Sequence, residues 1–139
     1  MHQQGAVPVK EIPVRILEGK KLQAVVDGHI LHTDQPQADG GDGTGPKPSD
    51  LFLASLATCG AFFARLYCDK RGLNADGLDI VMEYETAEKT RLVTKLVFKI
   101  TTPEDFPDAH RAPLERAIQS CYVKKHLKDD IEVETAFVN

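Results

Sequence analysis

The sequence has few of the residues that mark several large classes of protein. It contains no tryptophan, only 6% aromatic residues and only three cysteines in 139 residues. Three cysteines are too few for a disulfide scaffold. Lys and Arg total 17 against 21 Asp and Glu, and both signs are scattered, so no basic stripe is available to bind phosphates. These absences argue against a disulfide-stapled domain and against a nucleic-acid partner.

The first residues, MHQQGAVP, lack the cationic start and the apolar stretch of a secretory signal. We therefore expect a cytoplasmic location, where cysteines stay reduced. The length fits one domain, residues 1–139.

One long apolar run dominates the chain. Residues 51–68 (LFLASLATCGAFFARLYC) carry a single charge, Arg65, over eighteen residues, which approaches the length of a membrane span. Ser55 and Thr58 interrupt the run, and no second apolar segment accompanies it. We expect a central helix covered by protein on nearly every side, partly by a second subunit, and no membrane partner.

Around this run, apolar residues alternate with polar ones, which is typical of half-buried strands. The alternation predicts strands near residues 14–16, 22–26, 30–33, 78–84, 92–100 and 131–137, with a tight turn at Asp27-Gly28. Residues 34–48 are rich in Gly, Asp and Pro and predict a loop. Pro113, Leu114, Ala117, Ile118 and Cys121 predict a second, shorter helix with Cys121 facing inward. Strands, long helix, strands, helix and strand indicate an α+β fold.

The three cysteines are not equivalent. Cys59 and Cys68 are nine residues apart, so they lie on opposite helix faces, roughly 13 Å apart along the axis. They cannot form a disulfide, and Cys68 is interpreted as a core residue. Cys121 is left as the only candidate partner of Cys59, although spacing alone favours two buried thiols that do not react.

Two segments resemble a known family. GPKPSDLFLASLATC, which ends at Cys59, and SCYVKKHL, which contains Cys121, resemble the two cysteine motifs of the OsmC/Ohr family of thiol-dependent hydroperoxide reductases. The resemblance spans nearly the whole chain in element order, helix position and cysteine spacing. It implies an OsmC-like fold in which antiparallel sheets wrap around a long central helix, in an intertwined homodimer with active sites at the subunit interface.

The resemblance also implies a mechanism. Cys59 would attack an organic hydroperoxide and become a sulfenic acid, and Cys121 would resolve it as a Cys59–Cys121 disulfide. A dithiol or small-thiol reductant would then reset the pair, without a cofactor. Tyr122 departs from the family, which often has proline after the second cysteine.

Cys59 needs help to ionise, because a free thiol with a pKa near 8.5 is mostly protonated at neutral pH. It lies in about the third turn after Pro48, beyond the reach of the helix dipole, so a cation or a strong donor is required. The hydroperoxide-reducing branches use an arginine from the preceding loop, held by a glutamate ten residues before the cysteine. Here that loop has no arginine. The candidates for activating or orienting Cys59 are Ser49, which occupies the glutamate position, Asp50, Arg15, Lys47, His32 and an Arg111 from a second subunit.

Two other functions stay open. The missing arginine would suit a small-molecule binding protein with little peroxidase turnover. A metal site drawn from the cysteines and His29, His32, His110 and His126 is disfavoured, because closely spaced ligand pairs are absent, and we expect no metal. Phe62 and Phe63, one turn beyond Cys59, suit the walls of a pocket for an organic peroxide, although such aromatics more often pack in a core.

Overall fold

The computed structural model describes residue 8, residues 10–128 and residues 131–139. The chain divides into two compact units, Met1–Phe52 and Leu53–Asn139.

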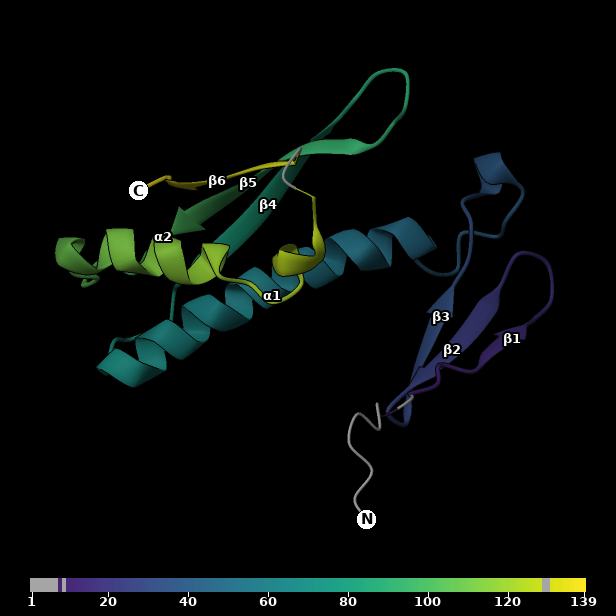
Figure 1. The fold of residues 1–139 in the computed structure, drawn as a ribbon, viewed down its shortest axis with the longest axis horizontal. Coiled ribbons are helices and arrows are strands. Elements are labelled where there is room, and N and C mark those ends of the chain that lie inside the picture. Colours follow the sequence, from purple (N-terminus) through teal and green to yellow (C-terminus); the bar gives the residue numbers. More distant parts are fainter. Residues whose placement is uncertain (1–7, 9, 129–130) are drawn as a thin grey trace, which may run out of the picture. The chain divides into compact units, whose positions relative to one another are not determined.

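The first unit contains a three-stranded antiparallel sheet. Its strands β1 (Val14–Ile16), β2 (Leu22–Val26) and β3 (His29–Thr33) follow one another in sequence and in space (Figure 1). Asp27 and Gly28 join β2 to β3 with φ angles of 47° and 79°. Both angles are left-handed, as a type I′ hairpin turn requires, so the strands and the predicted Asp-Gly turn are confirmed.

The predicted loop follows β3 and is organised around one buried carboxylate. Asp34 accepts hydrogen bonds from the N–H groups of Gln35, Asp42 and Thr44 and from the Thr44 hydroxyl. A short 3-10 helix, η1 (Gln37–Asp39), lies within this loop. The loop thus returns on itself before the long helix begins.

The long helix α1 (Pro48–Arg71) contains the whole apolar run. Pro48 occupies the first helical position, where its missing N–H is not needed. The carboxylate of Asp50 accepts a hydrogen bond from the Lys47 N–H at 3.4 Å and so caps the N-terminus of the helix. The predicted helix is confirmed.

The second unit contains another three-stranded sheet, in the order β4 (Asp79–Thr86), β5 (Val93–Thr101) and β6 (Glu132–Phe137). The β4–β5 hairpin is antiparallel, as predicted, but β6 pairs with β5 in parallel. The α+β class is confirmed, and the predicted antiparallel pairing holds for both hairpins but not for the last strand. Side-chain alternation identifies a strand but not its direction.

The remaining helices of the second unit lie between β5 and β6. They are the short 3-10 helix η2 (Asp108–His110), α2 (Arg111–Gln119) and the 3-10 helix η3 (Lys124–His126) (Figure 1). Residues from α1, β5, α2 and the loop before η2 form one buried core, which includes Ala64, Tyr67, Cys68, Phe98, Ile100, Phe106, Leu114 and Ile118. Cys68 is fully buried there, as predicted.

Helix α1 is only partly covered within a single chain. By length and composition it could cross a membrane, with a mean hydropathy of 1.6, but core helices of soluble proteins pass the same test. Only 28% of its most apolar window is buried, and Phe62 is 58% exposed. Cover from a second subunit stays a prediction.

Candidate functional site: a thiol pair beside a backbone turn

Cys59 lies in the middle of α1, and Cys121 follows the end of α2. The sequence prediction placed Cys121 in the last turn of the second helix, and this is wrong in detail. Helix α2 ends at Gln119 and is capped by Ser120, so Cys121 begins the turn that leads into η3. Its side chain is nevertheless buried, with 2% exposure, as the inward-facing prediction required.

The fold brings these two cysteines together within one chain. Hydrogen bonding from the Cys121 thiol and from the backbone N–H groups of Val123 and Tyr122 acts to lower the pKa of Cys59. All three donors come from one short segment, residues 121–123. Both cysteines are free thiols.

Burial and hydrogen bonding shift the pKa values of the two thiols in opposite directions. Burial by itself raises the pKa of Cys59, but the hydrogen bonds from Cys121, Val123 and Tyr122 outweigh it and lower that pKa below its ordinary value. Burial and the hydrogen bond to Cys59 raise the pKa of Cys121, despite opposing bonds from the N–H groups of Lys124 and Val123. Of the two thiols, Cys59 is therefore the one that ionises more readily.

The turn has N–H groups to offer because it starts a helical segment. The Lys125 N–H donates to the Cys121 carbonyl at 3.3 Å, and the His126 N–H donates to the Val123 carbonyl at 3.0 Å. The first N–H groups of any helical segment have no carbonyl partner within it. Those of Tyr122 and Val123 can therefore point at Cys59.

Apart from Arg111, the predicted activating side chains belong to the first unit. Arg15 is exposed on β1, Ser49 is exposed in the first turn of α1, and Asp50 caps that helix by accepting from the Lys47 N–H. All four residues precede Leu53, whereas both cysteines follow it. Their action on Cys59 stays a prediction.

Arg111 has a structural role within its own chain. Its guanidinium donates to the Asp108 carboxylate, the Thr102 hydroxyl and the Asn139 carbonyl, at 3.2, 2.9 and 3.0 Å. The same group lies over the Phe137 ring, 4.9 Å from its centroid. These contacts tie α2 to the residues at and beyond the ends of β5 and β6. They give no support to the hypothesis that Arg111 activates a cysteine.

The predicted pocket walls lie one turn beyond Cys59. The Phe62 and Phe63 rings meet edge to face with centroids 5.5 Å apart, and Phe63 is half-buried. An exposed Phe62 next to the thiol suits contact with an apolar substrate, which stays a prediction.

The histidines take separate roles in the structure. His110 Nδ1 shares a hydrogen bond of 2.7 Å with the Tyr67 hydroxyl, and His126 Nδ1 lies 3.1 Å from the Tyr122 carbonyl oxygen. His29 and His32 are exposed on β3. Among the described residues, no three His, Cys, Asp or Glu side chains lie close enough together to hold a metal ion.

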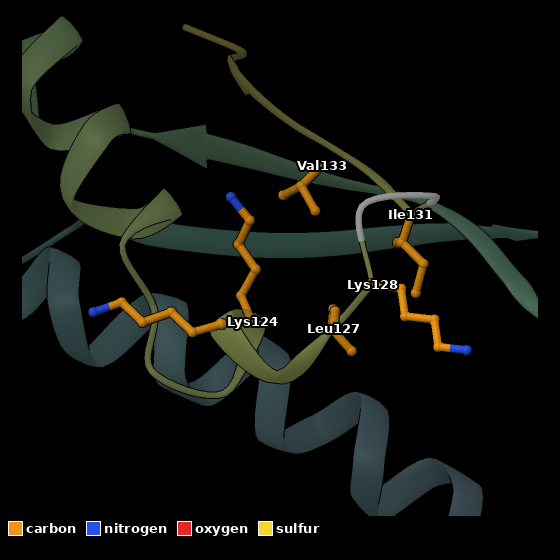
Figure 2. Close-up of a pocket in the computed structure, with 6 residues that line it drawn as sticks. Lys124, Leu127, Lys128, Ile131 and Val133 are labelled. Carbon is orange, nitrogen blue, oxygen red and sulfur yellow. The ribbon is translucent and has the colours of Figure 1, made fainter.

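A cavity of about 320 Å³ lies between η3 and β6 (Figure 2). It is lined by Lys124, Lys125, Leu127, Lys128, Ile131 and Val133. Lys124 lines this cavity, and its backbone N–H also hydrogen-bonds the Cys121 thiol. The cysteines themselves are not among the described residues that line it.

Sequence reasoning missed Tyr122 and Val123 as functional residues. They act through backbone N–H groups, so their side-chain types carry no signal. One indirect signal is present in the sequence: the loop before the long helix has no arginine, so the donor that activates Cys59 has to come from elsewhere in the chain.

The chain is similar to a known protein family. The family model described as OsmC-like protein matches residues 41–136. The chain belongs to the OsmC-like family. No curated protein sequence matches it significantly.

Solved structures share this OsmC-like fold at low sequence identity. A putative osmotic stress induced and detoxification response protein from Psychrobacter arcticus is 19% identical with a TM-score of 0.81, covering 96% of this chain and 98% of that one. An organic hydroperoxide resistance protein OsmC from Legionella pneumophila is 16% identical with a TM-score of 0.64, covering 94% and 98%. The organic hydroperoxide resistance protein OhrB of Bacillus subtilis is 18% identical with a TM-score of 0.59, covering 92% and 98%.

Proposed function

We propose that this OsmC-like protein reduces organic hydroperoxides with Cys59 as the peroxidatic thiol and Cys121 as the resolving thiol. The observation that carries the proposal is the contact between the two thiols, in which the pKa of Cys59 is lowered and that of Cys121 is raised. Only the thiolate attacks, so a lowered pKa makes Cys59 the better nucleophile near neutral pH.

The reduction of the peroxide balances with these two residues, which together supply both electrons and both protons. The Cys59 thiolate attacks the outer peroxide oxygen, the O–O bond breaks, and the alcohol leaves after taking up a proton. The resulting sulfenic acid then reacts with Cys121, which forms the disulfide and releases water. A dithiol or a small thiol reduces that disulfide by exchange and restores both thiols. No cofactor is required.

The family supports the same chemistry. Two of the similar solved structures are named as organic hydroperoxide resistance proteins. We extend that activity to this chain because its two cysteines lie in contact, as the disulfide step needs. We also propose a homodimer acting in the cytoplasm.

The test is to treat the protein with one equivalent of cumene hydroperoxide and identify the products by mass spectrometry. We expect a Cys59–Cys121 disulfide in the wild type. In Cys121→Ser, which removes the resolving thiol, we expect a sulfenic acid on Cys59 that dimedone traps. Cys68→Ala is the matched control and should form the same disulfide as the wild type, because Cys68 is buried in the core.

An oxidation rate of Cys59 no faster than that of free cysteine would contradict the proposal. It would favour the second candidate, an OsmC-like small-molecule binding protein with little peroxidase turnover. The observation behind that candidate is the lack of any arginine between Arg15 and Arg65.

A further inference from the structure

We propose that His126 and Lys124 are positioning residues that orient the backbone N–H groups of the cysteine turn, residues 121–126, toward the sulfur of Cys59. The proposal deepens the proposed function by naming what replaces the missing arginine. The experiment below measures the ionisation of Cys59 directly, so its result is independent of whether the protein reduces hydroperoxides.

The need for positioning follows from the kind of donor that surrounds Cys59. The groups that lower its pKa are the Cys121 thiol and the N–H groups of Val123 and Tyr122, and all of them are uncharged. A hydrogen bond weakens steeply when the donor turns away from the acceptor. Peptide groups in a short turn can rotate, so side-chain contacts add to the backbone hydrogen bonds that hold them, such as the bond from the Lys125 N–H to the Tyr122 carbonyl at 3.2 Å.

His126 holds the peptide group that matters most. Its Nδ1 atom lies 3.1 Å from the Tyr122 carbonyl oxygen, and a carbonyl can only accept, so Nδ1 carries the proton. That carbonyl and the Val123 N–H are opposite ends of one rigid peptide plane. Fixing the oxygen therefore aims the N–H at Cys59.

Contact between the side chains adds to this restraint. The rings of His126 and Tyr122 meet edge to face with centroids 4.9 Å apart. A hydrogen bond accepted by the carbonyl also polarises the peptide and strengthens its N–H as a donor. We therefore assign His126 an indirect effect on Cys59, which it exerts through the Tyr122–Val123 peptide.

Lys124 anchors the turn to the preceding helix. Its Nζ donates to the Gln119 carbonyl oxygen at 3.2 Å, at the last residue of α2. A positive charge is favourable there, because the end of a helix carries partial negative charge. The Lys124 N–H meanwhile bonds the Cys121 thiol. One residue therefore links the end of α2 to the resolving cysteine.

The experiment measures the rate at which iodoacetamide alkylates Cys59 as a function of pH, followed on the peptide that contains Cys59. In His126→Ala and Lys124→Met we expect the midpoint of the profile to move to higher pH. Losing one ordinary hydrogen bond corresponds to alkylation about three- to tenfold slower near pH 7. His126→Gln and Lys124→Arg keep an N–H donor and should restore most of the rate.

Matched controls separate positioning from a loss of folding. Lys125→Met removes an exposed lysine from the same turn, and His29→Ala removes an exposed histidine from β3; both should alkylate like the wild type. His126→Phe keeps a ring against Tyr122 but lacks the donor, so it tests the hydrogen bond if His126→Ala folds poorly.

Wild-type pH profiles in folded His126→Phe and Lys124→Met would overturn the proposal. Equal shifts in the Lys125→Met control would overturn it too. A shifted profile in protein that cumene hydroperoxide does not oxidise would leave the positioning roles standing and reject the peroxidase function instead.

Discussion

At the scale of single residues, three chemically identical thiols acquire three different environments. Burial raises the pKa of Cys68, with a further contribution from the nearby Asp69 carboxylate. Cys121 is buried too, and its pKa is raised. Only Cys59 has enough donors to overcome burial, so its pKa falls. Hydrogen bonding therefore distinguishes Cys59 from the other two thiols.

Gly60, the neighbour of Cys59, allows α1 to pack closely in the second unit. A methyl group at this position would lie 2.8 and 3.2 Å from ring atoms of the buried Phe98 and 3.3 Å from the Ile118 side chain. Those side chains belong to the core and have little room to move. We expect Gly60→Ala to lower the free energy of unfolding by about 1–3 kcal/mol through overpacking, despite its better helix propensity.

Urea denaturation measures this change. Thr58→Ala, on the exposed side of the same helix, is the control and should stay within about 0.5 kcal/mol of the wild type. A stabilised Gly60→Ala protein would show that the core has more space around Phe98 than the structure describes.

At the scale of elements, the loop before α1 depends on Asp34. The pKa of Asp34 falls from 3.8 to about 2, chiefly because the Thr44 N–H donates to its carboxylate against the effect of burial. The Gln35 and Asp42 N–H groups and the Thr44 hydroxyl add to this. A carboxylate with a depressed pKa stabilises the folded state above its unfolded pKa and loses that effect as the pH falls.

We therefore expect Asp34→Asn to lower the melting temperature at pH 7 and to speed amide hydrogen exchange at Asp42 and Thr44. The difference from the wild type should narrow as the pH falls from about 4 toward 2. Asp39→Asn, an exposed carboxylate in η1, should change neither quantity. A difference that is independent of pH would mean that the shape of Asp34, and not its charge, supports the loop.

The elements themselves show what sequence alone could predict. Period-two alternation found the strands, and Asp27-Gly28 fixed the first hairpin, because these signals are local. The parallel pairing of β6 with β5 was missed, since pairing direction depends on where the chain returns after α2. The N–H donors of Tyr122 and Val123 were missed as well, because every residue but proline carries the same group.

At the scale of the whole molecule, each unit leaves large apolar side chains exposed. In the first unit, Ile16 on β1 is 81% exposed, and in the second, Phe62 on α1 is 58% exposed. Only 28% of the most apolar window of α1 is buried, and a long exposed apolar stretch is typical of surfaces that bind protein. It supports the proposed homodimer.

We expect light scattering after gel filtration to give twice the chain mass of 15.3 kDa. Ile16→Glu and Phe62→Glu should shift the protein toward the monomer and lower its melting temperature, because a buried unpaired carboxylate opposes association. Leu92→Glu changes an exposed apolar residue just before β5; it is the control and should remain dimeric. A stable, folded wild-type monomer at micromolar concentration would contradict an intertwined assembly, since each chain would then keep its fold with α1 largely uncovered.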